Sequence, residues 1–132
     1  MTTTANPLLD FSGLPRFDLF KPEHVTPAIT ELIGHASDVV KTLEAPSDNV
    51  TWENFVVPLE ESTERLGRAW GVVNHLNNVA DTPELRAAYN ENLPKITEFW
   101  TALSQNEALF AKYKAIAASP AFASLSPARQ KL

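Results

Sequence analysis

Apolar residues recur at helical spacing along most of the chain, and proline-rich breaks separate the periodic segments. The first such segment runs from Pro22 or Thr26 to about Glu44, with apolar residues spaced by three and one. This spacing gives one apolar helix face, whereas a one-sided strand needs strict alternation. The residues on this face are Val25, Ala28, Ile29, Leu32, Ile33, Ala36, Val39, Val40 and Leu43.

Residues 51–94 predict a helical hairpin around which the rest of the chain is organised. Thr51 is the expected cap of the second helix, and Pro58 predicts a kink or a brief interruption near Phe55. The tetrapeptide at 81–84 ends this helix and begins the next, and so short a turn predicts antiparallel neighbours. The apolar stripe of the second helix comprises Trp52, Phe55, Leu59, Leu66, Trp70 and Val73.

Three further helical segments are predicted in the carboxyl-terminal part. The third helix extends from Pro83 to about Gln105, with a second kink expected at Pro94. Its apolar stripe comprises Leu85, Ala88, Tyr89, Ile96, Phe99, Trp100 and Leu103. Asn106 caps a fourth helix that holds Leu109, Phe110, Tyr113 and Ile116. Ser126 and Pro127 begin a fifth, whose single turn indicates a piece of a longer protein.

The first 21 residues lack a helical period, because prolines interrupt them repeatedly. They are too apolar for a solvated tail, so we expect an extended arm that lies on a helical surface and buries several side chains. The apolar residues of the arm are Leu8, Leu9, Phe11, Leu14, Phe17, Leu19 and Phe20. The predicted class is all-α, an antiparallel helical bundle at 22–132 with an extended arm at 1–21.

Composition limits the possible functions. The 132 residues are 44% hydrophobic and can form one domain or part of one. A formal charge of −5 with scattered basic residues argues against a nucleic-acid or anionic-membrane surface. The chain has no cysteine, which excludes thiolate chemistry and disulfides. No secretory signal or membrane-spanning run is visible, so a cytoplasmic protein is expected.

The candidates for chemistry are few. His24, His35 and His75 do not lie three or four residues apart on a helix, so no two of them share a face as a zinc site requires. We interpret His24 as a loop or helix-start residue. No phosphate loop or nucleophile motif is present. The sequence therefore predicts no catalytic, cofactor-binding or metal-binding residue in this chain.

Two polar groups on the second helix are interpreted as surface. His75 is accompanied by Asn74, Asn77 and Asn78, which can line a cleft but are better explained as a hydrogen-bonded polar face. Nearer the start of the helix, an acidic run meets two arginines four residues on, which predicts a solvated ion-pair face. The residues of this ion-pair face are Glu60, Glu61, Glu64, Arg65 and Arg68.

Val72, Leu76 and Val79 lie on a second apolar side of the same helix, away from its main stripe. We expect them to form an exposed patch that a symmetric dimer covers. The alternative is that the chain's own arm covers this side.

Several short motifs together resemble the amino-terminal region of the thimet-oligopeptidase-like (M3) family of zinc metallopeptidases. They occur in the family's order from Asn6 to about Tyr113. The motifs are Asn6-Pro7-Leu8-Leu9, Leu14-Pro15-Arg16-Phe17, Pro22-Glu23-His24-Val25, Thr51-Trp52-Glu53-Asn54, Pro58-Leu59-Glu60, Leu66-Gly67-Arg68, His75-Leu76-Asn77, Thr82-Pro83-Glu84-Leu85-Arg86 and Leu93-Pro94.

The resemblance implies an all-helical cytoplasmic parent enzyme that cleaves short peptides inside a deep channel. In that family an H-E-x-x-H helix and a further glutamate hold the zinc, and this chain has no such motif. We therefore expect a piece of the channel wall that is inert alone, with the remainder of the peptidase chain as its partner. The alternatives are a free-standing helical interaction module and the same region of a dipeptidyl carboxypeptidase.

Overall fold

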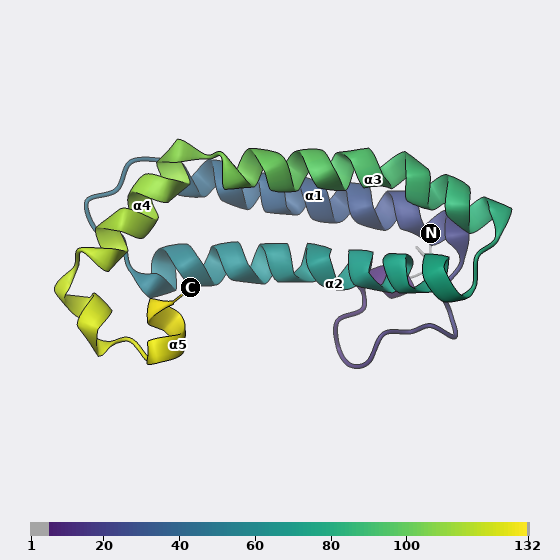
Figure 1. The fold of residues 1–132 in the computed structure, drawn as a ribbon, viewed down its shortest axis with the longest axis horizontal. Coiled ribbons are helices and arrows are strands. Elements are labelled where there is room, and N and C mark those ends of the chain that lie inside the picture. Colours follow the sequence, from purple (N-terminus) through teal and green to yellow (C-terminus); the bar gives the residue numbers. More distant parts are fainter. Residues whose placement is uncertain (1–5, 132) are drawn as a thin grey trace, which may run out of the picture.

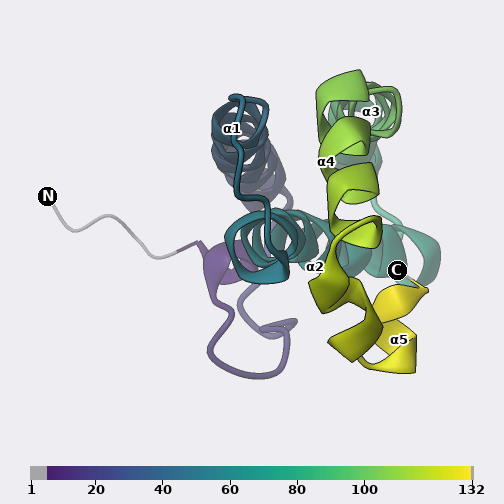
Figure 2. The same cartoon turned by 90° about the vertical axis from the view of Figure 1, so that its left-hand side faces the viewer.

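The computed structural model describes residues 6–131, and within that range the chain is helical without any strand. Three long helices form its body, namely α1 (Val25–Leu43), α2 (Val57–Val79) and α3 (Pro83–Ser104). Seen end-on they stand at the corners of a triangle, and α2 runs antiparallel to the other two (Figures 1 and 2). The predicted all-α class with antiparallel hairpins is confirmed.

Two shorter helices, α4 (Glu107–Ala117) and α5 (Pro127–Gln130), follow α3. α4 turns from the end of α3 toward the start of α2, and α5 lies beside that start (Figures 1 and 2). Short helical turns supplement these elements. They are the 3₁₀ turns η1 (Pro7–Leu9), η2 (Pro22–His24) and η4 (Pro120–Ser124), and the π-helical turn η3 (Trp52–Val56).

Side-chain caps explain where the helical segments begin. Thr51 Oγ1 accepts a hydrogen bond from the Asn54 backbone N–H at 3.1 Å, and Asn54 Oδ1 accepts one from the Thr51 N–H at 2.8 Å. This reciprocal pair satisfies two donors that a helix start leaves without partners. Thr82 and Asn106 each accept the N–H three residues on, at 3.2 and 3.1 Å, and so cap α3 and α4.

The two internal prolines have different outcomes. Pro58 lies in the first turn of α2, directly after the π-helical turn, so the interruption predicted near Phe55 is present in that form. The Val57 N–H before it still bonds the Trp52 carbonyl oxygen, so the missing N–H of Pro58 removes one donor from the ladder where the π-helical turn passes into α2. Pro94 lies inside α3, which continues through it as one helix.

The core consists of two clusters. The first lies at the α2–α3 hairpin end, between the three long helices and the start of the arm, and comprises Leu8, Val25, Ala28, Ile29, Leu32, Leu66, Ala69, Val73, Leu85 and Ile96. The second joins the end of α1, the π-helical turn and α4, and comprises Leu43, Phe55, Val56, Leu59, Leu109 and Ile116. α4 therefore closes the end of the bundle that the hairpin leaves open.

Two aromatic residues of the predicted third and fourth helices lie at the surface. Trp100 on α3 is 38% exposed and Phe110 on α4 is 64% exposed. The stripe prediction was wrong for Trp100, because helical period alone does not tell how wide a face the neighbouring helices cover.

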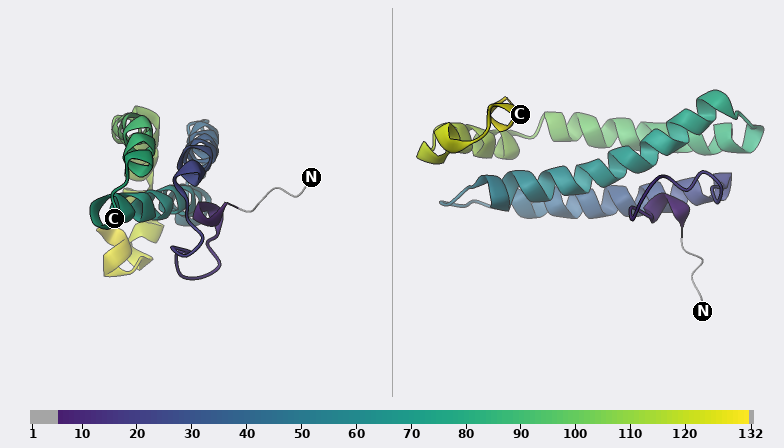
Figure 3. Two further views of the ribbon diagram at one scale, coloured as in Figure 1. Left: turned by 90° about the vertical axis from the view of Figure 1, so that its right-hand side faces the viewer. Right: turned by 90° about the horizontal axis from the view of Figure 1, so that it is seen from below.

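The arm packs on the bundle in part, as predicted, although residues 1–5 lie outside the described range. Leu8 is buried in the first cluster, and Leu9, Phe11 and Phe20 pack partly against it. The loop that follows lies beside α2, near the start of α1 (Figures 1 and 3). Three of its apolar side chains are nevertheless exposed, namely Leu14, Phe17 and Leu19.

Candidate functional site

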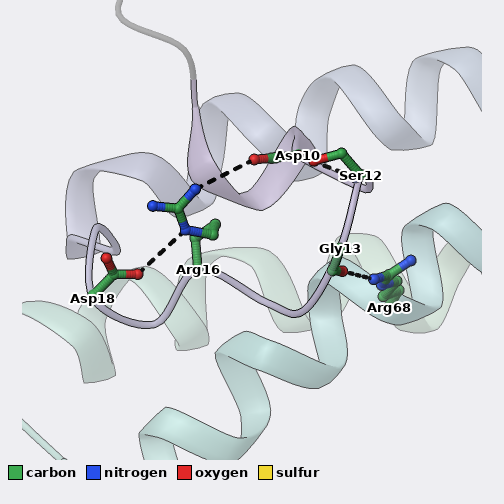
Figure 4. Close-up of polar contacts among 6 residues, drawn as sticks. All are labelled: Asp10, Ser12, Gly13, Arg16, Asp18 and Arg68. Atoms are coloured by element: carbon green, nitrogen blue, oxygen red, sulfur yellow. Dashed lines mark hydrogen bonds and ion pairs between the residues drawn. The ribbon is translucent and has the colours of Figure 1, made fainter.

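Arg68 of α2 attaches the arm to the bundle (Figure 4). Its guanidinium donates a hydrogen bond to the Gly13 carbonyl oxygen and lies 5.8 Å from the centre of the Phe11 ring. A cation over an aromatic face and a charged hydrogen bond each contribute modestly at a surface. Together they fix the loop of the arm across α2.

A second polar group holds the loop in its own conformation (Figure 4). Arg16 lies 4.0 Å from an Asp10 carboxylate oxygen and 3.4 Å from one of Asp18. Ser12 donates both its hydroxyl and its backbone N–H to Asp10 Oδ1. These hydrogen bonds, more than the nearby arginines, lower the pKa of Asp10.

The predicted ion-pair face on α2 is wrong. Within residues 6–131 the only ion pairs are those of Arg16 with Asp10 and Asp18 and of Arg86 with Asp81. Arg68 points to the arm instead of toward Glu64. A helix period predicts which residues share a face, but not which partner a long side chain selects.

The side of α2 expected to form an exposed apolar patch is largely covered by the arm. Val72 and Leu76 are half-buried against the first cluster, and the ring of Phe17 lies 5.9 Å from that of His75. Val79 remains 66% exposed. The expected patch is therefore wrong for Val72 and Leu76, and the alternative, cover by the arm, holds for Val72, which lines a hollow with Leu8 and Phe11.

The polar group around His75 faces several directions. Asn74 accepts a hydrogen bond from the Tyr89 hydroxyl at 3.3 Å, whereas His75 contacts the arm. The side-chain oxygen of Asn77 is buried and has no hydrogen-bond partner among the described residues. These residues are not brought together around one cavity, so the surface interpretation is favoured over a cleft.

A pocket of about 370 Å³ lies where α4 and α5 meet the π-helical turn. The sequence did not predict this pocket. Trp52 and Tyr113 form part of its wall, and the Arg129 guanidinium lies 5.0 Å from the Trp52 ring centre. Burial, with a smaller contribution from the Glu60 charge, raises the pKa of Tyr113. No local signal predicts this pocket, because its walls are separated by more than fifty residues of sequence.

A comparison with known protein families assigns the helical body to one of them. The family profile described as "Neurolysin/Thimet oligopeptidase, N-terminal domain" matches residues 29–132. The chain belongs to this family. The match takes in α1 from its second turn onward and every later helix, so the helical body described above is the family's N-terminal domain.

Several full-length members of the neurolysin/thimet oligopeptidase family are similar to this chain. Oligopeptidase A of Haemophilus influenzae is 43% identical over 128 residues, covering 96% of this chain and 18% of the relative. The organellar oligopeptidase A of Arabidopsis thaliana is 42% identical over 131 residues, covering 99% and 16%. Oligopeptidase A of Escherichia coli is 39% identical over 126 residues, covering 96% and 18%. The chain thus spans less than a fifth of each relative.

The zinc that the resemblance implies does not fit the described residues of this family member. In the range 6–131, no three His, Cys, Asp or Glu side chains are grouped so that they could hold a metal ion. His24 ends the η2 turn directly before α1, and its Nδ1 accepts the Lys21 N–H at 3.0 Å, which closes that turn and makes no cap bond to α1. His35 and His75 are exposed on different helices. None of the described helices is long and apolar enough to cross a membrane.

The role of Arg68 can be tested on the arm. Replacing Arg68 with Ala removes the hydrogen bond to Gly13, and a bond of this kind is worth about 1 kcal/mol. We expect amide exchange in residues 10–20 to accelerate by roughly five-fold, while exchange in α1 and α3 stays unchanged. Arg65→Ala is the matched control, because Arg65 lies on the same helix and is exposed. Equal exchange in both variants would show that Arg68 does not hold the arm.

Proposed function

We propose that this chain is the amino-terminal helical part of a cytoplasmic zinc-dependent oligopeptidase and contributes to the wall of the channel that admits short peptides. The observation that carries the proposal is the family match over residues 29–132, which includes nearly all of the helical body. The name of one plant relative includes the word cytosolic and that of another places it in organelles.

In this proposal the chain supplies shape, and the remainder of the enzyme supplies catalysis. Large apolar side chains at the surface of α3 and α4 support a buried position in a larger assembly. Leu93, Trp100 and Phe110 are 37, 38 and 64% exposed. Exposed apolar groups of this size are typical of surfaces that contact another part of a protein.

The proposal predicts that the isolated chain is inert toward peptides. A quenched fluorescent peptide incubated with the purified chain, with and without added zinc, is expected to show no turnover above buffer. This result follows because the residues 6–131 offer no grouped metal donors, and metal-activated water is the family's implied nucleophile. Turnover that co-purifies with the chain through successive columns would contradict the proposal.

A chimera tests the positive half of the proposal. This chain replaces the matching domain of E. coli oligopeptidase A, to which it is 39% identical. We expect the chimera to cleave the quenched peptide, and a deletion lacking the domain to lose at least ten-fold of that activity. A chimera no more active than the deletion would favour the alternative, a free-standing interaction module.

A further inference from the structure

One face of α2 is left uncovered and carries two glycines. Gly67 and Gly71 lie one helical turn apart in the interior of α2, and both are exposed. Glycine is, after proline, the least favourable residue in a helix interior. No described glycine has a positive φ angle, and a Cβ atom placed on either residue would meet no heavy atom within 4 Å. Nothing in the described part of the chain therefore requires glycine at these positions.

The other sides of α2 are already occupied. Leu66, Ala69 and Val73 face the core, and the arm covers the side that contains Arg68 and Val72. At 100° per residue, the glycines lie on the remaining side. α2 is thus covered by the bundle and by the arm, but not along the face that contains Gly67 and Gly71.

The same face is acidic nearer the start of α2. Glu60 and Glu64 precede Gly67 by seven and three residues, so all of them share one face with Gly71. Both glutamates are exposed, and neither forms an ion pair within residues 6–131. A segment that packs on this face therefore contacts the Glu60 and Glu64 carboxylates next to the backbone of Gly67 and Gly71, which no Cβ atom covers.

We propose that a helix from the remainder of the oligopeptidase polypeptide packs on this face, with its backbone close to Gly67 and Gly71 and basic side chains near Glu60 and Glu64. Without a Cβ atom at these positions, a second helix can approach α2 closely. This close approach explains why α2 contains two glycines although glycine lowers the stability of the isolated helix. This inference rests on the proposed function.

Two observations favour the remainder of the same polypeptide as the occupant. The chain spans only 16 to 18% of its relatives, so most of the assembled protein is available to cover it. The last described helix, α5, lies beside the first turns of α2, where Arg129 packs on Trp52 (Figures 1 and 3). Polypeptide that continues from α5 starts next to α2, within reach of the glycine face.

Thiol labelling measures whether the glycine face is covered, because the chain has no cysteine of its own. Gly67→Cys, Gly71→Cys and Gly34→Cys are prepared in the isolated chain and in the E. coli oligopeptidase A chimera, with the labelled position identified by peptide mass mapping. Gly34 is the matched control, since it lies inside α1, is exposed and has the same open surroundings. We expect all three cysteines to react alike in the isolated chain. In the chimera, positions 67 and 71 are expected to react at least ten-fold more slowly, and position 34 at an unchanged rate.

Bulky replacements provide a second readout with opposite signs. The double change Gly67→Leu and Gly71→Leu is expected to raise the Tm of the isolated chain, because leucine favours the helix and meets no obstacle. In the chimera the same change is expected to lower both Tm and peptide cleavage, whereas Gly34→Leu lowers neither.

The outcomes separate the inference from the proposed function. A chimera that cleaves peptide while positions 67 and 71 stay fully reactive overturns the inference alone. An inactive chimera with slow labelling at these positions overturns the channel-wall role in the proposed function, while the packing of the oligopeptidase polypeptide on this face is supported. Labelling of the isolated chain that slows as its concentration rises would assign the face to a second copy, and so would also overturn the inference.

Discussion

Replacing Phe55 with Ala is expected to bring this domain close to unfolding. Phe55 is 1% exposed, and its ring lies 4.9 Å from that of Tyr113 in an edge-to-face arrangement. It therefore joins the π-helical turn to α4, which closes the second core cluster. Truncation of a buried phenylalanine costs about 3–5 kcal/mol, and domains of this size have a total stability of about 5–15 kcal/mol.

The effect is measured by thermal and urea unfolding, both followed through far-UV circular dichroism. We expect a Tm lowered by more than about 10 °C and a clear fall in the urea midpoint. Phe110→Ala is the control, because it makes the same chemical change on α4, at a residue that is 64% exposed. Its effect should stay within about 0.5 kcal/mol. Comparable losses from the two variants would show that the second cluster does not hold the end of the bundle together.

The contrast between Phe55 and Phe110 illustrates what the sequence can predict here. Helices and their starts depend on residues within one or two turns, so apolar spacing and the caps at Thr51, Thr82 and Asn106 were sufficient to place them. Which flank of a helix is covered depends on where the other helices lie. For this reason the exposure of Trp100, which lies on a predicted stripe, and of Phe110 could not be predicted from the period alone.

The polar contacts were predicted less well, because their partners are distant in the chain. Arg68 binds the carbonyl of Gly13, which is 55 residues away, and this contact replaces the local pairing with Glu64 that the spacing favoured. At a solvent-exposed site the local ion pair is worth little, so a modest tertiary contact is enough to displace it.

Asn92 of α3 is a polar residue in the core, although the apolar period of the helix does not predict a core residue at this position. It is fully buried between α1 and α3, where its amide NH₂ donates to the Ala88 carbonyl at 2.8 Å and to Thr26 Oγ1 at 2.9 Å. The Thr26 hydroxyl in turn donates to Glu91 at 3.3 Å. The amide oxygen of Asn92 has no hydrogen-bond partner among the described residues. The site is therefore suited to a donor and poorly suited to an anion.

Asn92→Asp is expected to destabilise the domain strongly at neutral pH, although the side chain keeps almost the same shape. An ionised carboxylate cannot donate to the Ala88 carbonyl, and burial and the nearby Glu91 both disfavour its charge. Each unit by which burial raises the pKa of a carboxyl corresponds to about 1.4 kcal/mol, so a loss of about 3 kcal/mol or more at pH 7 is reasonable.

The pH dependence of this loss distinguishes a buried charge from a merely altered shape. With its pKa raised in the folded state, Asp at position 92 keeps a proton that the unfolded chain releases above about pH 4. Stability relative to the parent therefore falls as pH rises through that value, and the deficit shrinks when pH is lowered toward 4. Asn92→Leu is the control, since it loses the same two hydrogen bonds without gaining a titrating group, and its deficit should not change with pH. Urea titrations of both variants between pH 4 and 8 measure the two stability losses. If the loss for Asn92→Asp is constant over this range, the α1–α3 interface admits water to the carboxylate.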